Sequence, residues 1–377
     1  MTLDFWKSPA PAREDPDYMR AALALARRGL GRTAENPSVG ALIVRDGVIV
    51  GQGWTQDGGR PHAERVALDA AGDLAKGATL YVTLEPCSHH GKTPPCANAI
   101  VAAGISRVVS ALEDPDPRVA GQGHEILRKA GVAVTTGVCA GEALRVTLGH
   151  VLRVRETRPM VTLKLAETFD GYAAGDEHDP RLTITSAPAN ARTHTLRAMH
   201  DAIMIGIGTA KADDPLMTVR APGLEDSKPL RVALDARLAL SPRSRLAMSA
   251  HETPVLLLAD ANADSSRAKI LREAGVDIAA AAVGDDGRIE LRDALAALAQ
   301  RGITRVFSEG GPRIGAALIA QGLADEVVIF TAPKPHGRGA PALSKDARAI
   351  LADPERYTLV EDAKLGVDRM RRYERVM

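Results

Sequence analysis

The chain of 377 residues has only three cysteines, too few for the disulfide framework of small secreted domains. Its 48 Lys and Arg residues nearly balance 47 Asp and Glu residues. That balance argues against nucleic-acid or membrane-surface binding, which usually needs an excess of basic residues. No apolar run reaches the roughly 20 residues that cross a bilayer, and the N-terminal residues lack the basic-then-apolar pattern of a signal peptide. We therefore expect a cytoplasmic protein with no nucleic-acid or membrane partner.

The length favours two domains, because 377 residues exceed what one ordinary hydrophobic core supports. A connecting helix is expected from about residue 141 toward the polar sequence Arg-Glu-Thr-Arg-Pro, which ends at residue 159. We place the boundary in this stretch and expect one domain at 1–150 and a second at 151–377.

Strand and helix signals alternate in the first domain. The turn Asp46-Gly47 between two apolar runs is a strong hairpin signal. Strands separated by helices predict a mixed sheet covered on both faces. The expected strands are at 40–44, 48–50, 79–84, 107–112 and 132–137. The expected helices are at 17–28, 62–71, from 96 onward, and 125–130.

The second domain shows a longer alternating series, which predicts a three-layer α/β domain with mostly parallel strands. It lacks a Gly-x-Gly-x-x-Gly loop, but glycine turns at 206–208 and 310–311 each follow a predicted strand. Such turns let a ligand approach the backbone, or they are purely structural; paired on neighbouring strands, they leave a nucleotide cleft and a structural role equally open. The expected strands are at 160–165, 202–205, 231–234, 255–258, 305–308 and 326–330. The expected helices are at 187–199, 265–274, 291–301 and 314–321.

The strongest chemical signal is the motif Pro-His-Ala-Glu at 61–64, followed by Glu-Pro-Cys at 85–87 and Pro-Cys at 95–96. One imidazole and two thiolates can hold zinc at three corners of a tetrahedron and leave the fourth corner free, as in catalytic zinc sites. His-x-Glu followed by Pro-Cys-x(n)-Cys is typical of zinc deaminases that act on amino-pyrimidines or amino-purines. The alternative is two buried cysteines and a surface histidine. The occurrence of His, Glu, Pro, Cys and Cys in the right order favours the zinc site.

The expected helices place His62, Glu64 and Cys96 where zinc binding and proton transfer require them. His62 and Cys96 both lie at predicted helix starts, where free N–H groups and the helix dipole favour a thiolate on Cys96. Glu64 lies in the first turn of its helix, within reach of a metal-bound water. Cys139 is left over and is expected to pack as a small apolar side chain.

Together these motifs resemble the RibD family of bifunctional deaminase–reductases of riboflavin biosynthesis. The resemblance extends over nearly the whole chain from about Asp17, and the eight-residue gap between Cys87 and Cys96 is specific to it, because nucleoside and tRNA deaminases have two residues there. The motifs that carry it are Asn-Pro-Ser-Val-Gly at 36–40, the zinc motif, Lys-Leu-Ala at 164–166 with Asp-Gly at 170–171, Ile-Thr-Ser at 184–186, Gly-x-Gly-Thr at 206–209, Ala-Asp-x-Pro-Leu at 212–216 and Glu-Gly-Gly-Pro at 309–312.

The resemblance implies a cytidine-deaminase-like three-layer α/β domain followed by a dihydrofolate-reductase-like three-layer α/β domain. The first would use Zn²⁺ to deaminate 2,5-diamino-6-ribosylamino-4(3H)-pyrimidinone 5′-phosphate. The second would use NADPH to reduce 5-amino-6-(5-phosphoribosylamino)uracil to the ribitylamino product. The expected partners are thus phosphorylated pyrimidines, and homo-oligomer formation stays open.

Site residues follow by motif position. His62, Cys87 and Cys96 would bind zinc and Glu64 would move protons. Substrate contacts of the deaminase would be Asn36, His89 and Lys92. Substrate contacts of the reductase would be Arg197, Leu216, Arg220 and Glu309. Cofactor contacts would be Glu167, Thr183, Thr209, Asp213, Gly311, Pro312 and Arg313. Lys164 would either polarise the sugar or be a plain strand-end residue.

The chain departs from the family pattern at several of these positions. Thr55 replaces a histidine that would contact the deaminase substrate. Thr183 replaces a tryptophan beside the cofactor, and Arg181 stands where serine is common. Glu167 and Thr168 replace a small apolar residue and a serine, and the carboxylate at 167 would repel a cofactor phosphate unless it points away. Three alternatives stay open: a deaminase with lost or changed reductase activity, a nucleic-acid-binding deaminase, and a non-enzymatic zinc domain closed by a fourth protein ligand.

Overall fold

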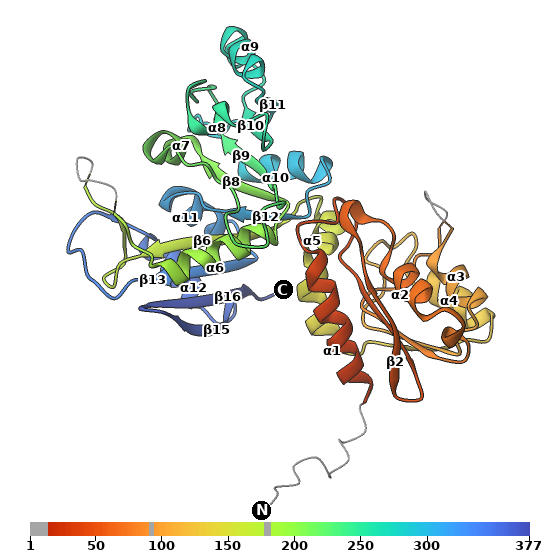
Figure 1. Cartoon of the computed structure of the whole chain (residues 1–377). Helices are drawn as coiled ribbons and strands as arrows, with labels where there is room; N and C mark the ends of the chain where they lie inside the picture. The colour runs from red at the N-terminus through yellow and green to blue at the C-terminus, as the bar shows by residue number, and fades with distance from the viewer. Residues whose placement is uncertain (1–13, 90–93, 177–181) are drawn as a thin grey trace, which may run out of the picture. The chain divides into compact units, whose positions relative to one another are not determined.

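The computed structural model describes residues 14–89, 94–176 and 182–377. The chain forms two compact units, Met1–Arg155 and Glu156–Met377 (Figure 1). The predicted connecting helix is present as α5 (Ala140–Glu156), and the predicted boundary at 150/151 falls inside it. Within the described ranges, no helix is both long enough and apolar enough to cross a membrane.

A five-stranded mixed sheet forms the centre of the first unit, with the strand order β2-β1-β3-β4-β5. The β1–β2 and β1–β3 pairs are antiparallel, whereas β3–β4 and β4–β5 are parallel. The strands are β1 (Gly40–Arg45), β2 (Val48–Trp54), β3 (Thr79–Val82), β4 (Arg107–Ser110) and β5 (Ala133–Thr136). Besides α5, the helices are α1 (Asp15–Ala26), α2 (Ala63–Ala71), α3 (Cys96–Ala102) and α4 (Gln122–Lys129), and short 3₁₀ turns lie at Arg27–Gly29, Asp57–Gly59 and Gly72–Ala75. The predicted mixed sheet is confirmed.

Two local features fix the first strands. Asp46 and Gly47 both have positive φ, at 51° and 77°, as the predicted two-residue hairpin turn requires. Gly51 and Gly53 of β2 lie directly under α2: a Cβ at Gly53 would come 2.5 Å from the carbonyl oxygen of Ala63, and one at Gly51 would come 2.3 Å from that of Ala67. Only glycine therefore lets β2 and α2 pack this closely.

A nine-stranded sheet spans the second unit in the order β11-β10-β9-β8-β12-β6-β13-β16-β15. The neighbours from β11 to β13 are parallel, and β13–β16 and β16–β15 are antiparallel. The strands are β6 (Met160–Glu167), β8 (Ala202–Gly206), β9 (Leu230–Leu234), β10 (Val255–Ala259), β11 (Asp277–Ala280), β12 (Arg305–Ser308), β13 (Glu326–Thr331), β15 (Tyr357–Leu365) and β16 (Asp368–Arg375). A separate small pair joins β7 (Tyr172–Ala174) to β14 (Ala340–Pro341).

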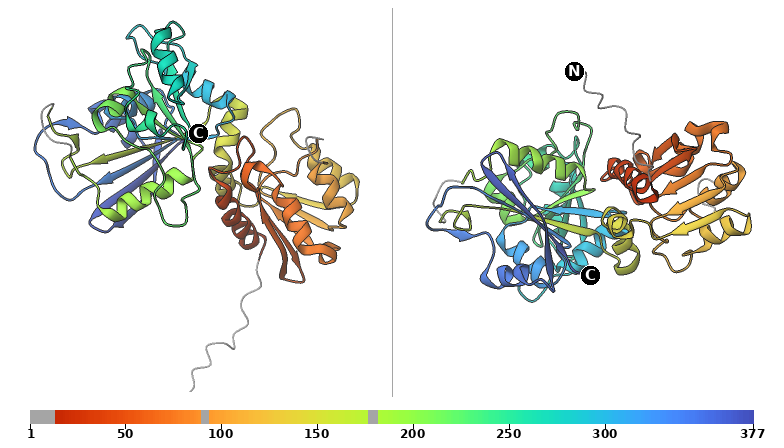
Figure 2. Two further views of the ribbon diagram at one scale, coloured as in Figure 1. Left: turned by 45° about the horizontal axis from the view of Figure 1, so that its top comes forward. Right: turned by 90° about the horizontal axis from the view of Figure 1, so that it is seen from below.

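Helices cover both faces of this sheet, which confirms the predicted three-layer arrangement. One buried cluster unites α10, α11 and α12 with side chains such as Leu163 and Leu165, and a second unites α6, α8 and α9 with Phe307 and Phe330. In the right-hand view of Figure 2 the sheet runs between green α6 and the blue helices of the other face. The helices are α6 (Ala187–Ala198), α7 (Ile207–Asp213), α8 (Arg245–Met248), α9 (Ser265–Glu273), α10 (Leu291–Gln300), α11 (Pro312–Ala320) and α12 (Lys345–Ala352).

A buried ion-pair cluster closes the start of β6 against β13 and β16. Asp325 is 2% exposed and accepts two hydrogen bonds from Arg158, at 2.7 and 2.9 Å. Arg375 donates to the same carboxylate at 3.0 and 3.2 Å, and so does the backbone N–H of Val161 at 3.0 Å. One carboxylate thus joins three strand ends.

Replacing Asp325 by alanine should lower the free energy of unfolding by about 3–5 kcal/mol, because it leaves buried guanidinium charge without its counter-charge. Urea unfolding followed by circular dichroism measures this change. Asp362→Ala is the matched control: its pair with Arg369 is largely exposed, so its cost should stay within about 1 kcal/mol. Equal costs for the two variants would show that burial does not set the strength of the Asp325 cluster.

Candidate active sites

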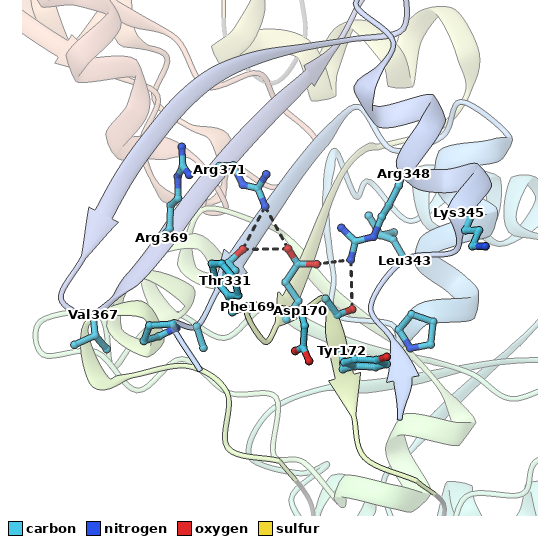
Figure 3. A pocket seen from close by; sticks show the side chains of 15 residues that line it. Phe169, Asp170, Tyr172, Thr331, Leu343, Lys345, Arg348, Val367, Arg369 and Arg371 are labelled. Atoms are coloured by element: carbon cyan, nitrogen blue, oxygen red, sulfur yellow. Dashed lines mark hydrogen bonds and ion pairs between the residues drawn. The ribbon is translucent and has the colours of Figure 1, made fainter. Parts of the chain in front are cut away.

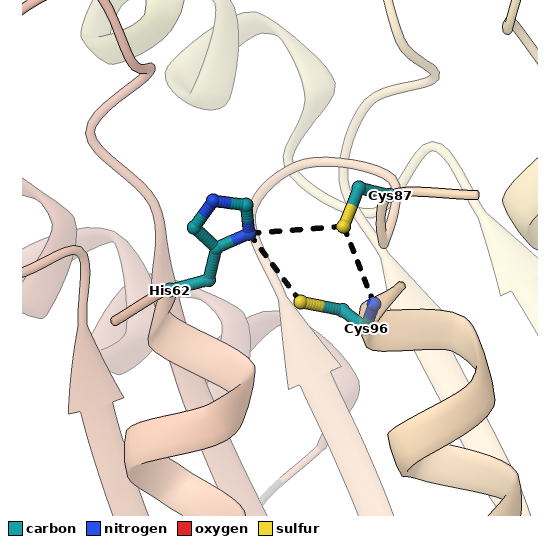
Figure 4. A group of neighbouring side chains, drawn as sticks. All are labelled: His62, Cys87 and Cys96. Carbon is teal, nitrogen blue, oxygen red and sulfur yellow. Dashed lines mark hydrogen bonds between the residues drawn. The ribbon is translucent and has the colours of Figure 1, made fainter. Parts of the chain in front are cut away.

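The zinc motif of the first unit converges in space. His62 is the residue just before α2, Cys96 is the first residue of α3, and Cys87 follows β3 (Figure 4). The Nδ1 atom of His62 lies 3.7 Å from Sγ of Cys87 and 3.4 Å from Sγ of Cys96. The three candidate ligand atoms all lie within 4.8 Å of one another. The structure therefore brings together the three side chains that the sequence selected.

These distances fit a tetrahedral zinc ion. Zn–S bonds of about 2.3 Å and Zn–N bonds of about 2.0–2.1 Å place nitrogen and sulfur about 3.5 Å apart at a tetrahedral angle. The two observed separations, 3.4 and 3.7 Å, lie on either side of that value. Two sulfurs and one imidazole are also the ligand types that zinc prefers. The side chains present thus suit zinc with three protein ligands.

The helix start at Cys96 acts on the neighbouring sulfur. The backbone N–H of Cys96 donates to Sγ of Cys87 at 3.2 Å. Hydrogen bonds from the side chain and backbone of Cys96 and from His62 lower the pKa of Cys87 to about 4. The pKa of Cys96 is instead raised, first by its hydrogen bond to Cys87 and then by burial. The start of α3, which was predicted to favour a thiolate on Cys96, thus directs its N–H group at the sulfur of Cys87.

Glu64 lies beside the three ligands. It is in the first turn of α2 and only 4% exposed. Burial raises the pKa of Glu64 to about 7, although the charge of His62 opposes this shift. A carboxyl group with a pKa near neutrality can both accept and release a proton, which is the property required of a general acid–base.

The expected substrate contacts of the deaminase differ in their burial and in their distance along the chain from the zinc ligands. Asn36 is half-buried and its side-chain amide packs against Gly59, a few residues before His62. His89 is exposed just beyond Cys87, and Lys92 lies outside the described residues. Thr55 is 2% exposed, accepts from the backbone N–H of Val39 and donates to the carbonyl of Pro37. Thr55 therefore fixes the segment next to Asn36 and does not offer its hydroxyl to a ligand.

One supporting residue was missed by the sequence interpretation. Glu85 is 5% exposed and accepts hydrogen bonds from four backbone N–H groups, at distances of 2.8 to 3.2 Å. The donors are Asp114, Gly121, Gly123 and His124. Glu85 thereby ties the loop before α4 to the segment that bears Cys87. Its position in the Glu-Pro-Cys motif was the available signal.

In the second unit, the two glycine turns meet at the ends of adjacent strands. β8 and β12 pair in parallel, so Gly206, the last residue of β8, and Gly310, two residues after β12, lie at neighbouring strand ends. A Cβ at either glycine would come 2.8 Å from the side chain of Ile314 in α11. A Cβ at Gly311 would meet Oγ1 of Thr209 at 3.5 Å. The structure thus brings Thr209 to Gly311, with Pro312 and Arg313 in the first turn of α11 and Asp213 at the end of α7.

The expected substrate side chains of this unit form an ion-pair cluster. Arg197 binds Glu309 through two hydrogen bonds of 2.5 and 3.0 Å and donates to the carbonyl of Thr218 at 2.8 Å. Burial opposes ionisation of Glu309, but Arg197, then Lys164 and His194, hold the pKa of Glu309 below its usual value. Arg197 is 11% exposed, so it does not lie on a solvated helix face.

Arg220 lies at the edge of the same cluster. It is exposed and donates to Oγ1 of Thr218 at 2.9 Å, while its backbone N–H donates to Nδ1 of His194. Burial and the nearby charges of Arg197 and Arg245 lower the pKa of Arg220. Leu216 lies half-buried on the same segment. Several cations thus surround this part of the domain, an arrangement that suits an anionic ligand.

Glu167 and Thr183 are the other two predicted cofactor contacts. Glu167 is 3% exposed, and its carboxylate binds Arg348 at 2.6 Å, Arg371 at 3.2 Å and Thr331 at 3.1 Å beside a cavity of about 850 Å³ (Figure 3). Its charge is therefore neutralised by Arg348 of α12 and Arg371 of β16. Thr183 is exposed on the segment before α6.

Comparison with known proteins identifies both units. The model of the cytidine and deoxycytidylate deaminase zinc-binding region matches residues 12–112, and that of the RibD C-terminal domain matches residues 159–363. The riboflavin biosynthesis protein RibD of Escherichia coli is 38% identical over 373 residues, 94% of this chain and 98% of that protein. The RibD of Aquifex aeolicus is 40% identical over 325 residues, 86% of this chain and 88% of that protein. The chain belongs to the RibD family.

Solved RibD structures agree with this membership. Acinetobacter baumannii RibD matches with a TM-score of 0.83 and 34% identity, and the match covers 96% of this chain and 99% of that one. A diaminohydroxyphosphoribosylaminopyrimidine deaminase/5-amino-6-(5-phosphoribosylamino)uracil reductase from Thermotoga maritima matches with a TM-score of 0.81 and 32% identity, with the same coverage. The predicted family, its two α/β domain types and its paired deaminase and reductase activities are confirmed. The predicted cofactors, zinc and NADPH, agree with RibD membership.

Replacing Cys87 by serine should remove most of the bound zinc, because it takes away one of two soft ligands in a site with three protein ligands. Metal analysis of the purified variant measures the zinc content per chain. Cys139→Ser is the matched control and should keep its zinc, because Cys139 contacts the carbonyl of Pro16 and is not among the three converging ligands. Full zinc retention in Cys87→Ser would refute the assigned ligand set.

Proposed function

We propose that the first domain deaminates 2,5-diamino-6-ribosylamino-4(3H)-pyrimidinone 5′-phosphate at C2. We propose that the second domain then reduces the ribosyl group of 5-amino-6-(5-phosphoribosylamino)uracil to the ribityl group. The T. maritima relative carries the corresponding pair of activities in its name. The observation that carries the proposal in this chain is the convergence of His62, Cys87 and Cys96 at zinc-ligand distances beside Glu64.

In the deaminase half, His62, Cys87 and Cys96 would hold zinc. When bound, zinc supplies Lewis acidity and lowers the pKa of water, so that water can attack at neutral pH. Glu64 accepts the proton that the attacking water loses and donates it to the leaving ammonia. Its burial and raised pKa suit both transfers. Asn36, His89 and Lys92 are proposed to orient the pyrimidine and its phosphorylated sugar.

In the reductase half, Thr209, Asp213 and the first turn of α11 from Gly311 are proposed to bind NADPH, which supplies the hydride when bound. The close approach of Thr209 to Gly311 supports this site, because glycine leaves the backbone open to a ligand at a helix start. Arg197, Glu309 and Arg220 are proposed to hold the substrate opposite the cofactor. Their mutual contacts, and the charge of Lys164 on Glu309, support a single binding region.

We also propose that the protein acts in the cytoplasm on free small molecules, without a nucleic-acid or membrane partner. Cys87 and Cys96 form no disulfide, and zinc ligation requires them to stay reduced. The nearly balanced charge, 48 basic against 47 acidic residues, supports a small-molecule substrate over a nucleic acid.

Glu64→Gln should keep zinc and fold but lose deamination by about 10²–10⁴-fold, because an amide cannot move the proton. Ammonia release from the diaminopyrimidinone phosphate measures the loss. Reduction of separately supplied 5-amino-6-(5-phosphoribosylamino)uracil is the internal control and should be unchanged, since its site lies in the other domain. Ammonia release near the wild-type rate would mean that another base carries the proton.

Arg220→Ala should weaken reduction by about 10- to 150-fold in kcat/KM, the effect of losing a charge-assisted contact of about 1.5–3 kcal/mol. NADPH oxidation measures this step and ammonia release measures the other, which should stay unchanged. Arg272→Ala, an exposed arginine on α9, is the matched control. Equal losses in the two half-reactions would place Arg220 outside the reductase substrate site.

A further inference from the structure

The segment at 214–220, between α7 and β9, carries two proposed substrate contacts, Leu216 and Arg220. Its backbone is unusual, because Asp214 and Met217 have positive φ values of 38° and 52° although neither is glycine. A side chain with a Cβ is strained in this region, and such a conformation persists only where the surroundings impose it. The residues that impose this backbone conformation therefore help to set the positions of Leu216 and Arg220.

Arg231, at the start of β9, is 0% exposed and reaches this segment from the sheet. Its Nη1 atom donates to the carbonyl of Leu216 at 3.0 Å and to Oγ of Ser249 at 2.8 Å. Its Nη2 atom donates to the carbonyl of Ser249 at 2.9 Å and also to that of Thr253. The guanidinium group thus joins the proposed substrate segment to the end of α8.

The charge of Arg231 is costly for the fold. Its four hydrogen-bond acceptors are carbonyls and one hydroxyl, none of them a carboxylate, and its Nε atom is buried without a partner within the described structure. Burial lowers the pKa of Arg231 to about 10, so it remains charged at neutral pH. Apolar side chains of similar volume would fill this core position at lower cost. A buried guanidinium group has one advantage over an apolar side chain: its planar array of N–H donors holds two backbone segments in one fixed geometry.

We propose that Arg231 is a positioning residue of the reductase, which holds the segment at 214–220 in the geometry that binds substrate. Hydrogen bonds attach the segment to its surroundings at several points. Asp214 accepts from the backbone N–H of Arg245, the carbonyl of Leu216 accepts from Arg231, the carbonyl of Thr218 accepts from Arg197, and the backbone N–H of Arg220 donates to His194. Arg197 is itself a proposed substrate contact, whereas Arg231 is fully buried and holds the Leu216 carbonyl from the sheet, out of reach of a substrate. This inference rests on the proposed function, which makes Arg220 a substrate contact, and on the expected substrate contact of Leu216.

The first test is steady-state kinetics of Arg231→Met in the full-length holoenzyme. Losing the attachment should raise KM for 5-amino-6-(5-phosphoribosylamino)uracil by about 10- to 100-fold, the effect of a small misplacement of binding groups. The turnover number should change by less than about threefold, and ammonia release should be unchanged, because Arg231 touches neither reacting group. Arg231→Lys, which keeps a charged donor for the Leu216 carbonyl, should restore part of the affinity.

Ser249→Ala is the matched control, because it removes one acceptor of Arg231 but leaves the bond to Leu216. It should keep the wild-type KM. If Arg231 only caps the end of α8, Arg231→Met and Ser249→Ala would both lower the melting temperature and leave KM unchanged. An unchanged KM in Arg231→Met, or an equal KM increase in both variants, would overturn the proposal.

Hydrogen exchange provides a second readout that does not depend on activity. The backbone amides at 216–220 should exchange faster in Arg231→Met than in Ser249→Ala, while amides in the core of β9 stay protected. Unchanged exchange in this segment would refute the positioning role. If wild-type protein failed to reduce the substrate at all, the proposed reductase function would fail, and the exchange experiment would still decide whether Arg231 holds the segment.

Discussion

Both candidate sites depend on one constraint: side chains that follow the carboxyl ends of neighbouring strands are brought together at one edge of the sheet. In the first unit Cys87 follows β3, and helices α2 and α3 begin beside it with His62 and Cys96. In the second unit the glycine turns follow β8 and β12. Residues separated by many positions in the sequence therefore meet, and each sheet serves as the rigid base of its site.

The parts of this arrangement that the sequence predicted are those with local, residue-specific causes. Zinc ligands are few in kind, so the pattern of His62, Cys87 and Cys96 was sufficient to select them. Most strands of the two sheets were predicted because runs such as Val-Leu-Leu-Leu at 255–258 are continuously apolar, as buried parallel strands are. The Asp46-Gly47 turn was equally local, because two adjacent left-handed residues are needed there.

The parts that escaped prediction depend on long-range contacts. Strand β16 reads as a charged segment, yet Arg372 binds Glu326 of β13 and Glu361 of β15, so cross-strand ion pairs replace the apolar alternation. Arg231 looked like the polar first residue of a strand and is fully buried. The direction of Glu167 could not be predicted either, because its partners Arg348 and Arg371 lie far along the chain. In each case the decisive partner is remote, and local pattern carries no information about it.

Some of the positions that matter most for the deaminase have no functional group at all. Gly53 lies under the first turn of α2, and a methyl group there would press on the carbonyl of Ala63, the residue between His62 and Glu64. A change from glycine to alanine at that position would thus shift an imidazole and a carboxylate together while leaving both intact. A comparison of natural variants that considers only the polar residues of the site would not detect the effect of such a substitution. In this chain, the tolerance of the metal site to sequence drift is set partly by a strand residue that touches neither metal nor substrate.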